Sequence, residues 1–488
     1  QQRQEQSQRQ LMRNADTGHT TMGLTGPVVF GCGLLLLGLA PVIRGGNRHV
    51  ALILLEWLGL FVLLALSFRA LTAAPSHLVT GHPSGRRSVG VWLLAAAPLW
   101  VCLFQLFPLP SGLWAALPGH APYAEALAVA QVSGNGYLAL SLTPDATSTS
   151  VLAGIPLVAA FLLAHFCSSP HLRRLVQALV VFAVAQAVLG LLQMGPFPGL
   201  SFGLVKGGRV VGTFANRNHF ASYITMTVPL AILLFRQATA SARGDARAHR
   251  GGRPMGALWG LALFLLLSAV LASASRGGTV TCLVVTLLAV LLLPQREGHW
   301  SARRHWGMAG AAGLLALVAL AVGVDALLAR FEAEGGYLSG ERWLYVIGTW
   351  HAALAFWPFG SGLGSYAAVF PAFQPIGVHG FIEHAHNDYV QLLMECGLLA
   401  VAFGALALAL IARQTARLVR RARRAGLDAA GLLQASCGLG LLAVLLHSWV
   451  DFNLRIPANA MLAVFLLGAF LRPLQPLPVK PARESVLE

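Results

Sequence analysis

The chain has 488 residues, of which 56% are hydrophobic and only 11% are charged. Soluble domains carry about 25% charged residues, so this composition excludes an ordinary soluble enzyme, a disordered chain and a disulfide scaffold. The formal net charge is +16. In a soluble protein this charge would indicate nucleic-acid binding, but in a membrane protein an excess of arginine marks the inner face.

Charge-poor apolar windows recur along the whole sequence, and each is close to the roughly 20 residues that a membrane-spanning helix needs. They predict an all-α polytopic membrane protein with about twelve transmembrane helices. The expected spans are residues 23–43, 50–67, 89–107, 151–166, 175–194, 220–235, 255–274, 279–294, 307–328, 389–412, 431–447 and 458–471. The first window lacks a cleavage pattern and is expected to be a retained helix.

The arginines gather in alternate connections between these spans, which indicates their cytoplasmic side. This arrangement predicts that both termini are cytoplasmic, although the short loop with Arg44 and Arg48 is an exception. The opposite side includes residues 108–150, which contain no lysine or arginine. Because the basic loops are short connectors, we do not expect nucleic acid as a partner.

The predicted organisation has a polar cytoplasmic tail, two blocks of membrane helices and a second cytoplasmic tail. The corresponding ranges are 1–22, 23–202, 203–471 and 472–488. A long outer loop, residues 329–388, lies between the ninth and tenth spans, and such loops are usually functional or disordered. Within it, residues 343–357 fit a helix lying in the membrane interface, and a glycine-rich turn, WPFGSGLGSY, follows.

Four arginines are expected on the outer side, although arginine normally gathers on the cytoplasmic side of a membrane protein. Their planar guanidinium groups can grip a phosphate or carboxylate in two places. Alternatively, they cap helix carbonyls, pair with nearby acids or extend to lipid headgroups. These residues are Arg209, Arg217, Arg276 (in SRGG, expected to be a tight turn) and Arg342.

The segment EHAHNDY combines histidines, acids and an amide at the start of a span. A histidine beside a carboxylate is a candidate general base, which favours His384 or His386 with support from Glu383. The two histidines are two positions apart and do not share a helical face, so a metal site is not predicted. For Asn387 and Asp388, the alternative is a cap on the following helix.

Other polar residues give weaker signals. Asn216, Asn218 and His219 flank Arg217 and are possible supporting residues. The polar groups of residues 447–459, among them Asp451, favour a structural role in the last outer turn. Glu56 and Glu395 lie within spans and are expected to be hydrogen-bond partners between helices, away from the outer residues. The six scattered cysteines form no CxxC pair and are expected to be core residues.

The order of the motifs carries a family resemblance. GTFANRNHFASYI, SASRGG, GERW, WPFGSGLGSY, EHAHNDYVQLLMECGLLA and HSWVDFNLRIPANAML follow one another between residues 203 and 468. This ordered set resembles the O-antigen ligase and O-antigen polymerase superfamily. The first two hundred residues agree with it only in their hydropathy.

The resemblance implies an inverting glycosyltransferase of the bacterial inner membrane, with an architecture similar to C-type glycosyltransferases and a periplasmic active site. It implies no metal, no other cofactor and no nucleotide sugar. The donor would be a glycan on undecaprenyl diphosphate. A ligase uses the lipid A core as acceptor, a polymerase uses a second lipid-linked glycan, and a protein O-oligosaccharyltransferase uses serine or threonine. We expect a ligase first and an O-antigen or exopolysaccharide polymerase as the alternative.

The family's functional residues correspond to particular positions of this sequence. Its histidine-asparagine motif falls on His386 and Asn387, and its phosphate-binding arginines fall on Arg217 (or Arg209) and Arg276. Arg342 matches a further basic position. The hypothesis is that arginines clamp the diphosphate while His386 accepts a proton from the acceptor.

A different class of function, a transporter of a small anion, would also use arginines and histidine. Transporters place their sites near the membrane midplane on broken helices and often show internal repeats. The polar residues here gather at one face, and the sequence shows no repeat, which disfavours transport.

Overall fold

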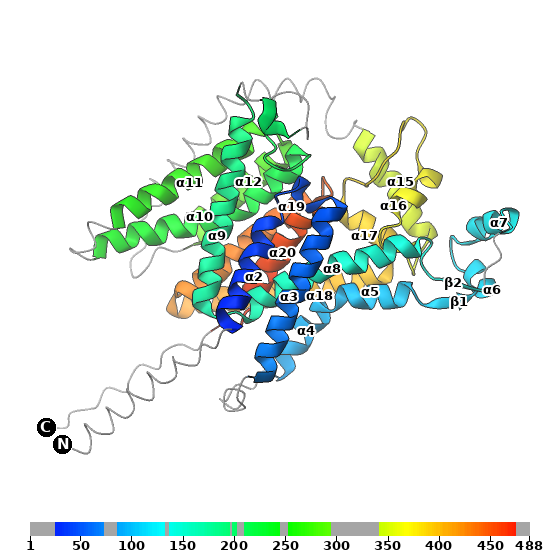
Figure 1. The fold of residues 1–488 in the computed structure, drawn as a ribbon, viewed down its shortest axis with the longest axis horizontal. Coiled ribbons are helices and arrows are strands. Elements are labelled where there is room, and N and C mark those ends of the chain that lie inside the picture. The colour runs from blue at the N-terminus through cyan, green and yellow to red at the C-terminus, as the bar shows by residue number, and fades with distance from the viewer. Residues whose placement is uncertain are drawn as a thin grey trace, which may run out of the picture.

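A computed structural model describes residues 25–72, 85–131, 136–195, 198–202, 209–244, 252–293 and 341–474. The described chain is almost entirely helical (Figure 1). Its one sheet is a ribbon in which β1 (Pro108–Pro110) pairs antiparallel with β2 (Tyr137–Ala139). The predicted all-α fold class is therefore confirmed.

Seven described helices contain segments long and apolar enough to cross a membrane. They are α3 (His49–Thr72), α8 (Pro144–Phe166), α9 (Ser169–Leu192), α10 (Arg217–Gly244), α11 (Gly252–Ala272), α18 (Leu398–Ala425) and α19 (Ala429–His447). Shorter apolar helices are α2 (Thr25–Leu39), α12 (Arg276–Leu292) and α20 (Pro457–Phe470). The polytopic membrane architecture is confirmed, while the predicted span 307–328 lies outside the described residues.

Two predicted spans are each formed by two helices. Residues 89–107 fall on α4 (Gly85–Ala95) and α5 (Ala97–Gln105). The span 389–412 falls on α17 (Asp388–Cys396) and α18, which are separated at Gly397. Gly397 has a φ of +53°, and a Cβ there would lie 2.2 Å from the carbonyl oxygen of Pro358. Only glycine fits this close approach of two backbones, so the helix breaks where the outer loop crosses it.

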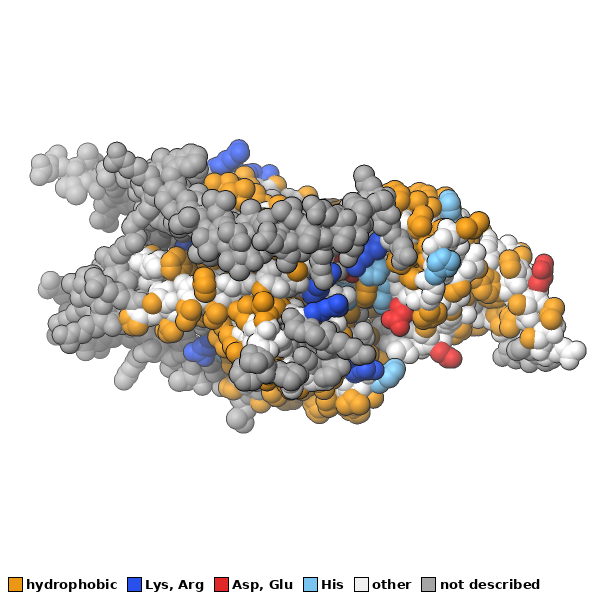
Figure 2. Space-filling model, turned by 90° about the horizontal axis from the view of Figure 1, so that it is seen from above, with side chains coloured by type: hydrophobic (Ala, Val, Ile, Leu, Met, Phe, Trp, Pro, Cys, Tyr) orange, Lys and Arg blue, Asp and Glu red, His pale blue; other side chains and the backbone are white. Residues whose placement is uncertain are grey.

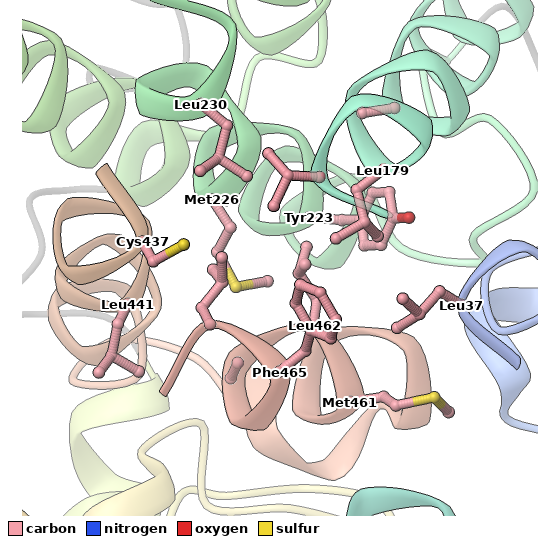
Figure 3. Close-up of a cluster of buried hydrophobic side chains, with 14 of the residues drawn as sticks. Leu37, Leu179, Tyr223, Met226, Leu230, Cys437, Leu441, Met461, Leu462 and Phe465 are labelled. Carbon is pink, nitrogen blue, oxygen red and sulfur yellow. The ribbon is translucent and has the colours of Figure 1, made fainter. Parts of the chain in front are cut away.

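Helix α10 forms the centre of the helix assembly and packs against α9, α11, α12, α19 and α20. Its Tyr223 and Met226 meet side chains of α20, including Leu462 and Phe465 (Figure 3). Gly440 of α19 allows this close packing, because a Cβ there would lie 2.4 Å from the backbone oxygen of Met226. Small residues commonly bring membrane helices into such contact.

Short elements, several of them from the predicted outer loop, form a second core. They are α6 (Ser111–Ala115), α7 (Ala121–Val129), α15 (Glu341–Ala355), α16 (Tyr366–Val369) and η4 (Phe370–Phe373). Buried rings of Tyr345, Phe356 and Phe370 pack together here. Helix α15 confirms the predicted helix at 343–357, and positive φ angles at Gly360, Gly362 and Gly364 confirm the glycine-rich turn.

Three 3-10 turns complete the described elements. They are η1 (Arg44–Gly46), η3 (Pro198–Ser201) and η5 (Asn453–Arg455). The last of them follows α19, and through its contacts with α10, α17 and α20 it joins the ends of helices that are distant in the sequence.

Candidate functional site

The first turn of α12 lies against α10 and α19. A Cβ on Gly277 would lie 2.8 Å from His447 Nε2, and one on Gly278 would lie 2.5 Å from the Cβ of Ala221. The two glycines of SRGG therefore allow three helix ends to meet. SRGG was expected to be a tight turn, but it begins a helix instead, because Ser275 Oγ accepts a hydrogen bond from the Gly278 N–H. Arg276 is the first residue of this helix.

The NRNH motif begins α10 beside this junction. Asn216 Oδ1 accepts from the Asn218 backbone N–H at 2.8 Å, and Arg217, half-buried, is the first helical residue. The Asn218 side chain donates to Asp451 Oδ2 at 2.6 Å. His219 is buried with its Nε2 3.7 Å from Asp451 Oδ1. The motif is thereby tied to the last outer turn.

Asp451 is a buried carboxylate shared by several donors. Its Oδ1 accepts from the Phe452 N–H at 2.9 Å and lies 3.0 Å from His386 Nδ1. Burial alone would raise the pKa of Asp451, but interactions with His219 and His386 hold it well below its usual range. Asp451 is therefore ionised and can only accept. It follows that His386 donates from Nδ1, and its Nε2 takes no part in this contact.

The backbone at His386 adopts the left-handed conformation, with a φ of +52°. For a residue other than glycine this costs on the order of 1–3 kcal/mol and is typical of functional sites. Asn387 helps to hold it: its Oδ1 accepts from the N–H groups of Tyr389 and Val390 at 3.0 and 3.1 Å, and its Nδ2 donates to Trp449 O at 3.0 Å. Asn387 thus caps α17, which is the alternative role expected for it from the sequence.

The Phe452 ring packs among three histidines. The ring centroids of His219, His384 and His386 lie 4.5, 4.3 and 4.8 Å from it. Tyr345 of α15 approaches His386 from the outer loop, with a centroid distance of 6.0 Å. The outer loop and the last turn therefore face each other across the histidines.

One face of α17 is polar and buried. Asn387, Gln391 and Glu395 are spaced four residues apart, which places them on the same side of the helix. Glu395 Oε2 lies 2.8 Å from Arg455 Nη2, and its Oε1 accepts from Gln391 Nε2 at 3.1 Å. The expectation that Glu395 lies away from the outer residues is wrong, because Gln391 connects it to His384.

The predicted arginines differ in their placement. Arg342, exposed at the start of α15, is close enough to His447 to act on it electrostatically. Arg217 begins α10, whose Asn218 donates to Asp451, and Arg276 begins α12, whose Gly277 lies against His447. Arg209 is exposed on a separate segment, in which the N–H groups of Val211 and Gly212 donate to Gln193, the residue after α9. Viewed from above, basic side chains lie beside histidines near the middle of the face (Figure 2).

The remaining predicted residue, Glu383, is exposed. Asp451, Gln391 and Arg455 are not among the functional residues predicted from the sequence. The four-residue spacing on α17 was a signal for Gln391, whereas nothing local identifies the partners of Asp451. Within the described chain, no group of three or more His, Cys, Asp or Glu side chains is arranged to hold a metal ion.

Comparison with protein families gives one match. Residues 261–405 match the family model described as O-antigen ligase. The matched range includes Arg276, Arg342, His384 and His386. It confirms the resemblance to the O-antigen ligase superfamily. No curated protein matches the chain. The matched domain supports a ligase-like glycan transferase family, and the apolar helices support a multi-pass membrane architecture.

Proposed function

We propose that the chain transfers a glycan from undecaprenyl diphosphate to the lipid A core at the periplasmic face, with inversion at the anomeric carbon. The O-antigen ligase match at 261–405 supports the family of the reaction. The observation that best supports the proposed base is the 3.0 Å contact between His386 Nδ1 and Asp451 Oδ1. It leaves Nε2 of His386 as a base.

In the proposed step, His386 Nε2 takes the proton from an acceptor hydroxyl. The hydroxyl oxygen attacks the anomeric carbon from the face opposite the diphosphate. The bond between that carbon and the phosphate oxygen breaks, and undecaprenyl diphosphate leaves with the electron pair. A positioned base of this kind contributes about 10²–10⁴-fold to the rate. Asp451 orients the imidazole and stabilises its protonated form.

Arg217 and Arg276 are proposed to bind the diphosphate. Each is the first residue of a helix, where the backbone dipole also favours an anion. Negative charge grows on the diphosphate as its bond breaks, so fixed guanidinium groups stabilise the transition state more than the ground state. Arg342 is proposed to add positive charge from the outer loop.

The proposed orientation places both termini in the cytoplasm and the site in the periplasm of a bacterial inner membrane. The arginine-free segment supports it: His120, in that segment, packs against Phe356, which follows α15. The outer loop and the arginine-free segment therefore lie on the same side, as the positive-inside rule requires of a periplasmic face.

The test uses a strain that lacks this protein and is complemented with variants of equal membrane abundance. His386→Ala and Asp451→Asn should both abolish core-linked glycan while long glycan accumulates on the lipid carrier. The exposed Asp145→Asn is the matched control and should keep wild-type transfer. Full transfer by His386→Ala would refute the assigned base. Loss of long carrier-linked glycan would instead show a polymerase.

A further inference from the structure

Behind the proposed base, a second histidine is held by a buried polar chain. His384 Nδ1 lies 3.2 Å from Gln391 Nε2, and the same amide nitrogen lies 3.1 Å from Glu395 Oε1. Glu395, fully buried, is paired with Arg455. The step proposed above uses none of these four side chains.

The orientation of the Gln391 amide follows from its neighbours. Its oxygen lies 3.1 Å from the backbone N–H of Ala385, which can only donate. Its nitrogen lies 3.1 Å from Oε1 of Glu395, whose other carboxylate oxygen is paired with Arg455. The amide therefore cannot be reversed, and the hydrogen that remains on its nitrogen points to His384.

The fixed amide determines the tautomer of His384. Because Gln391 donates to Nδ1, this nitrogen must accept, and the proton of the neutral ring is on Nε2. Burial, followed by electrostatic interactions with Arg455, His219 and His386, lowers the pKa of His384 to about 3. The ring is therefore neutral near pH 7. No hydrogen bond from the described residues takes up Nε2.

We propose that His384 is a substrate-binding residue whose Nε2–H donates a hydrogen bond to an uncharged oxygen of the glycan, and that Gln391 is the positioning residue that fixes this tautomer. The inference rests on the proposed function. A neutral donor complements the arginines, because they suit the anionic diphosphate, whereas hydroxyl and carbonyl oxygens of a sugar need only an N–H. The His384 ring also packs against Phe452, at a centroid distance of 4.3 Å, and lies near Tyr366, and these rings hold it in place.

Two substitutions at His384 test the donor directly. His384→Gln keeps an N–H near the position of Nε2, and His384→Leu removes it. The assay uses membranes that contain undecaprenyl-diphosphate-linked O-antigen as donor and core-only lipopolysaccharide as acceptor. We expect His384→Leu to raise KM for the donor glycan about tenfold, as one lost hydrogen bond would, with little change in kcat. His384→Gln should stay near the wild-type KM.

A paired exchange separates the tautomer from a merely structural role. In Gln391→Glu with Glu395→Gln, the charge and the contact between the two side chains are kept, but a carboxylate now faces His384 Nδ1. That nitrogen must then be protonated, and the neutral ring loses the donor at Nε2. We expect the double variant to have the raised KM of His384→Leu. A structural role predicts that the exchange restores wild-type KM.

The outcomes distinguish the two proposals. Wild-type KM in His384→Leu, or in the folded double variant, would overturn this inference and leave the proposed function standing. Absence of transfer by the wild-type chain would overturn the proposed function and this inference with it. If the double variant does not fold, the comparison of His384→Gln with His384→Leu decides.

Discussion

Helix α12 has an arginine at each end, and the two ends differ in their electrostatics. At its C-terminal end, Arg236 of α10 donates to the carbonyl oxygens of Ala289, Val290 and Leu293, the Val290 bond being 2.9 Å. Those carbonyls form the negative end of the helix dipole, where a cation stabilises. Arg276 stands at the opposite, positive end, where the dipole opposes a cation and favours an anion.

Arg472 repeats the inner arrangement at the end of α8, where its Nη1 donates to the carbonyls of Ala164 and Cys167 at 2.9 and 2.7 Å. The arginines of this inner region therefore complete helix C-termini with backbone partners. Arg217 and Arg276 stand instead at the N-terminal ends of α10 and α12. The same residue type serves structure in one region and, we propose, ligand binding in the other.

The largest effect on transfer is expected at Arg276, at the N-terminal end of α12. Arg276→Ala should lower transfer about 10²–10³-fold, in the range found when one donor to a developing anion is removed, while the melting temperature stays the same or rises. Arg276→Lys keeps the charge without the planar guanidinium group, and its transfer activity should fall between those of the wild type and Arg276→Ala. Transfer and thermal unfolding in detergent measure both effects. A strong loss of stability in Arg276→Ala would assign this arginine a structural role.

Arg236→Met should give the reverse pattern. Removing the guanidinium leaves buried helix carbonyls without donors, which costs on the order of 1–3 kcal/mol in the free energy of unfolding. Transfer per folded molecule should not change. Thermal unfolding and activity normalised to folded protein are the measurements. A stable but inactive Arg236→Met protein would contradict the division between inner and outer arginines.

A smaller effect is expected where the N-terminal end of α12 contacts the C-terminal end of α19. Gly277→Ala places a methyl group 2.8 Å from His447 Nε2, so the start of α12 or the imidazole must shift. We expect a few-fold decrease in transfer and a loss of about 1 kcal/mol, as for mild overpacking. The exposed Gly112, where a Cβ meets nothing within 4 Å, provides the matched Gly→Ala control. Unchanged transfer would show that His447 can move aside.

The smallest effect concerns pH and should arise only in the outer region. His384 has a pKa lowered to about 3, whereas an unfolded histidine titrates near 6.5. Between these values the unfolded chain binds more protons, so the protein loses stability as pH falls from about 6.5 toward 3. His384→Gln should make this acid dependence shallower. An identical dependence of the melting temperature on pH in both proteins would contradict the assignment.

The helices could be predicted from sequence because each span is a local apolar window, and His386 and Arg276 could be selected because their motifs are short and continuous. Asp451 could not, because its contact with His386 joins positions 65 residues apart. Its sequence neighbours suggest only a loop. The helix break at Gly397 likewise depends on the backbone of Pro358, which approaches it only in the folded chain.

The break at Gly397 also divides the tenth predicted span into two parts with separate surroundings. Helix α18 has 28 residues and is by itself long and apolar enough to be a candidate membrane span. Helix α18 can therefore satisfy the requirements of the membrane alone. The polar face of α17 is not bound by them, so Asn387, Gln391 and Glu395 can be polar without interrupting a membrane span.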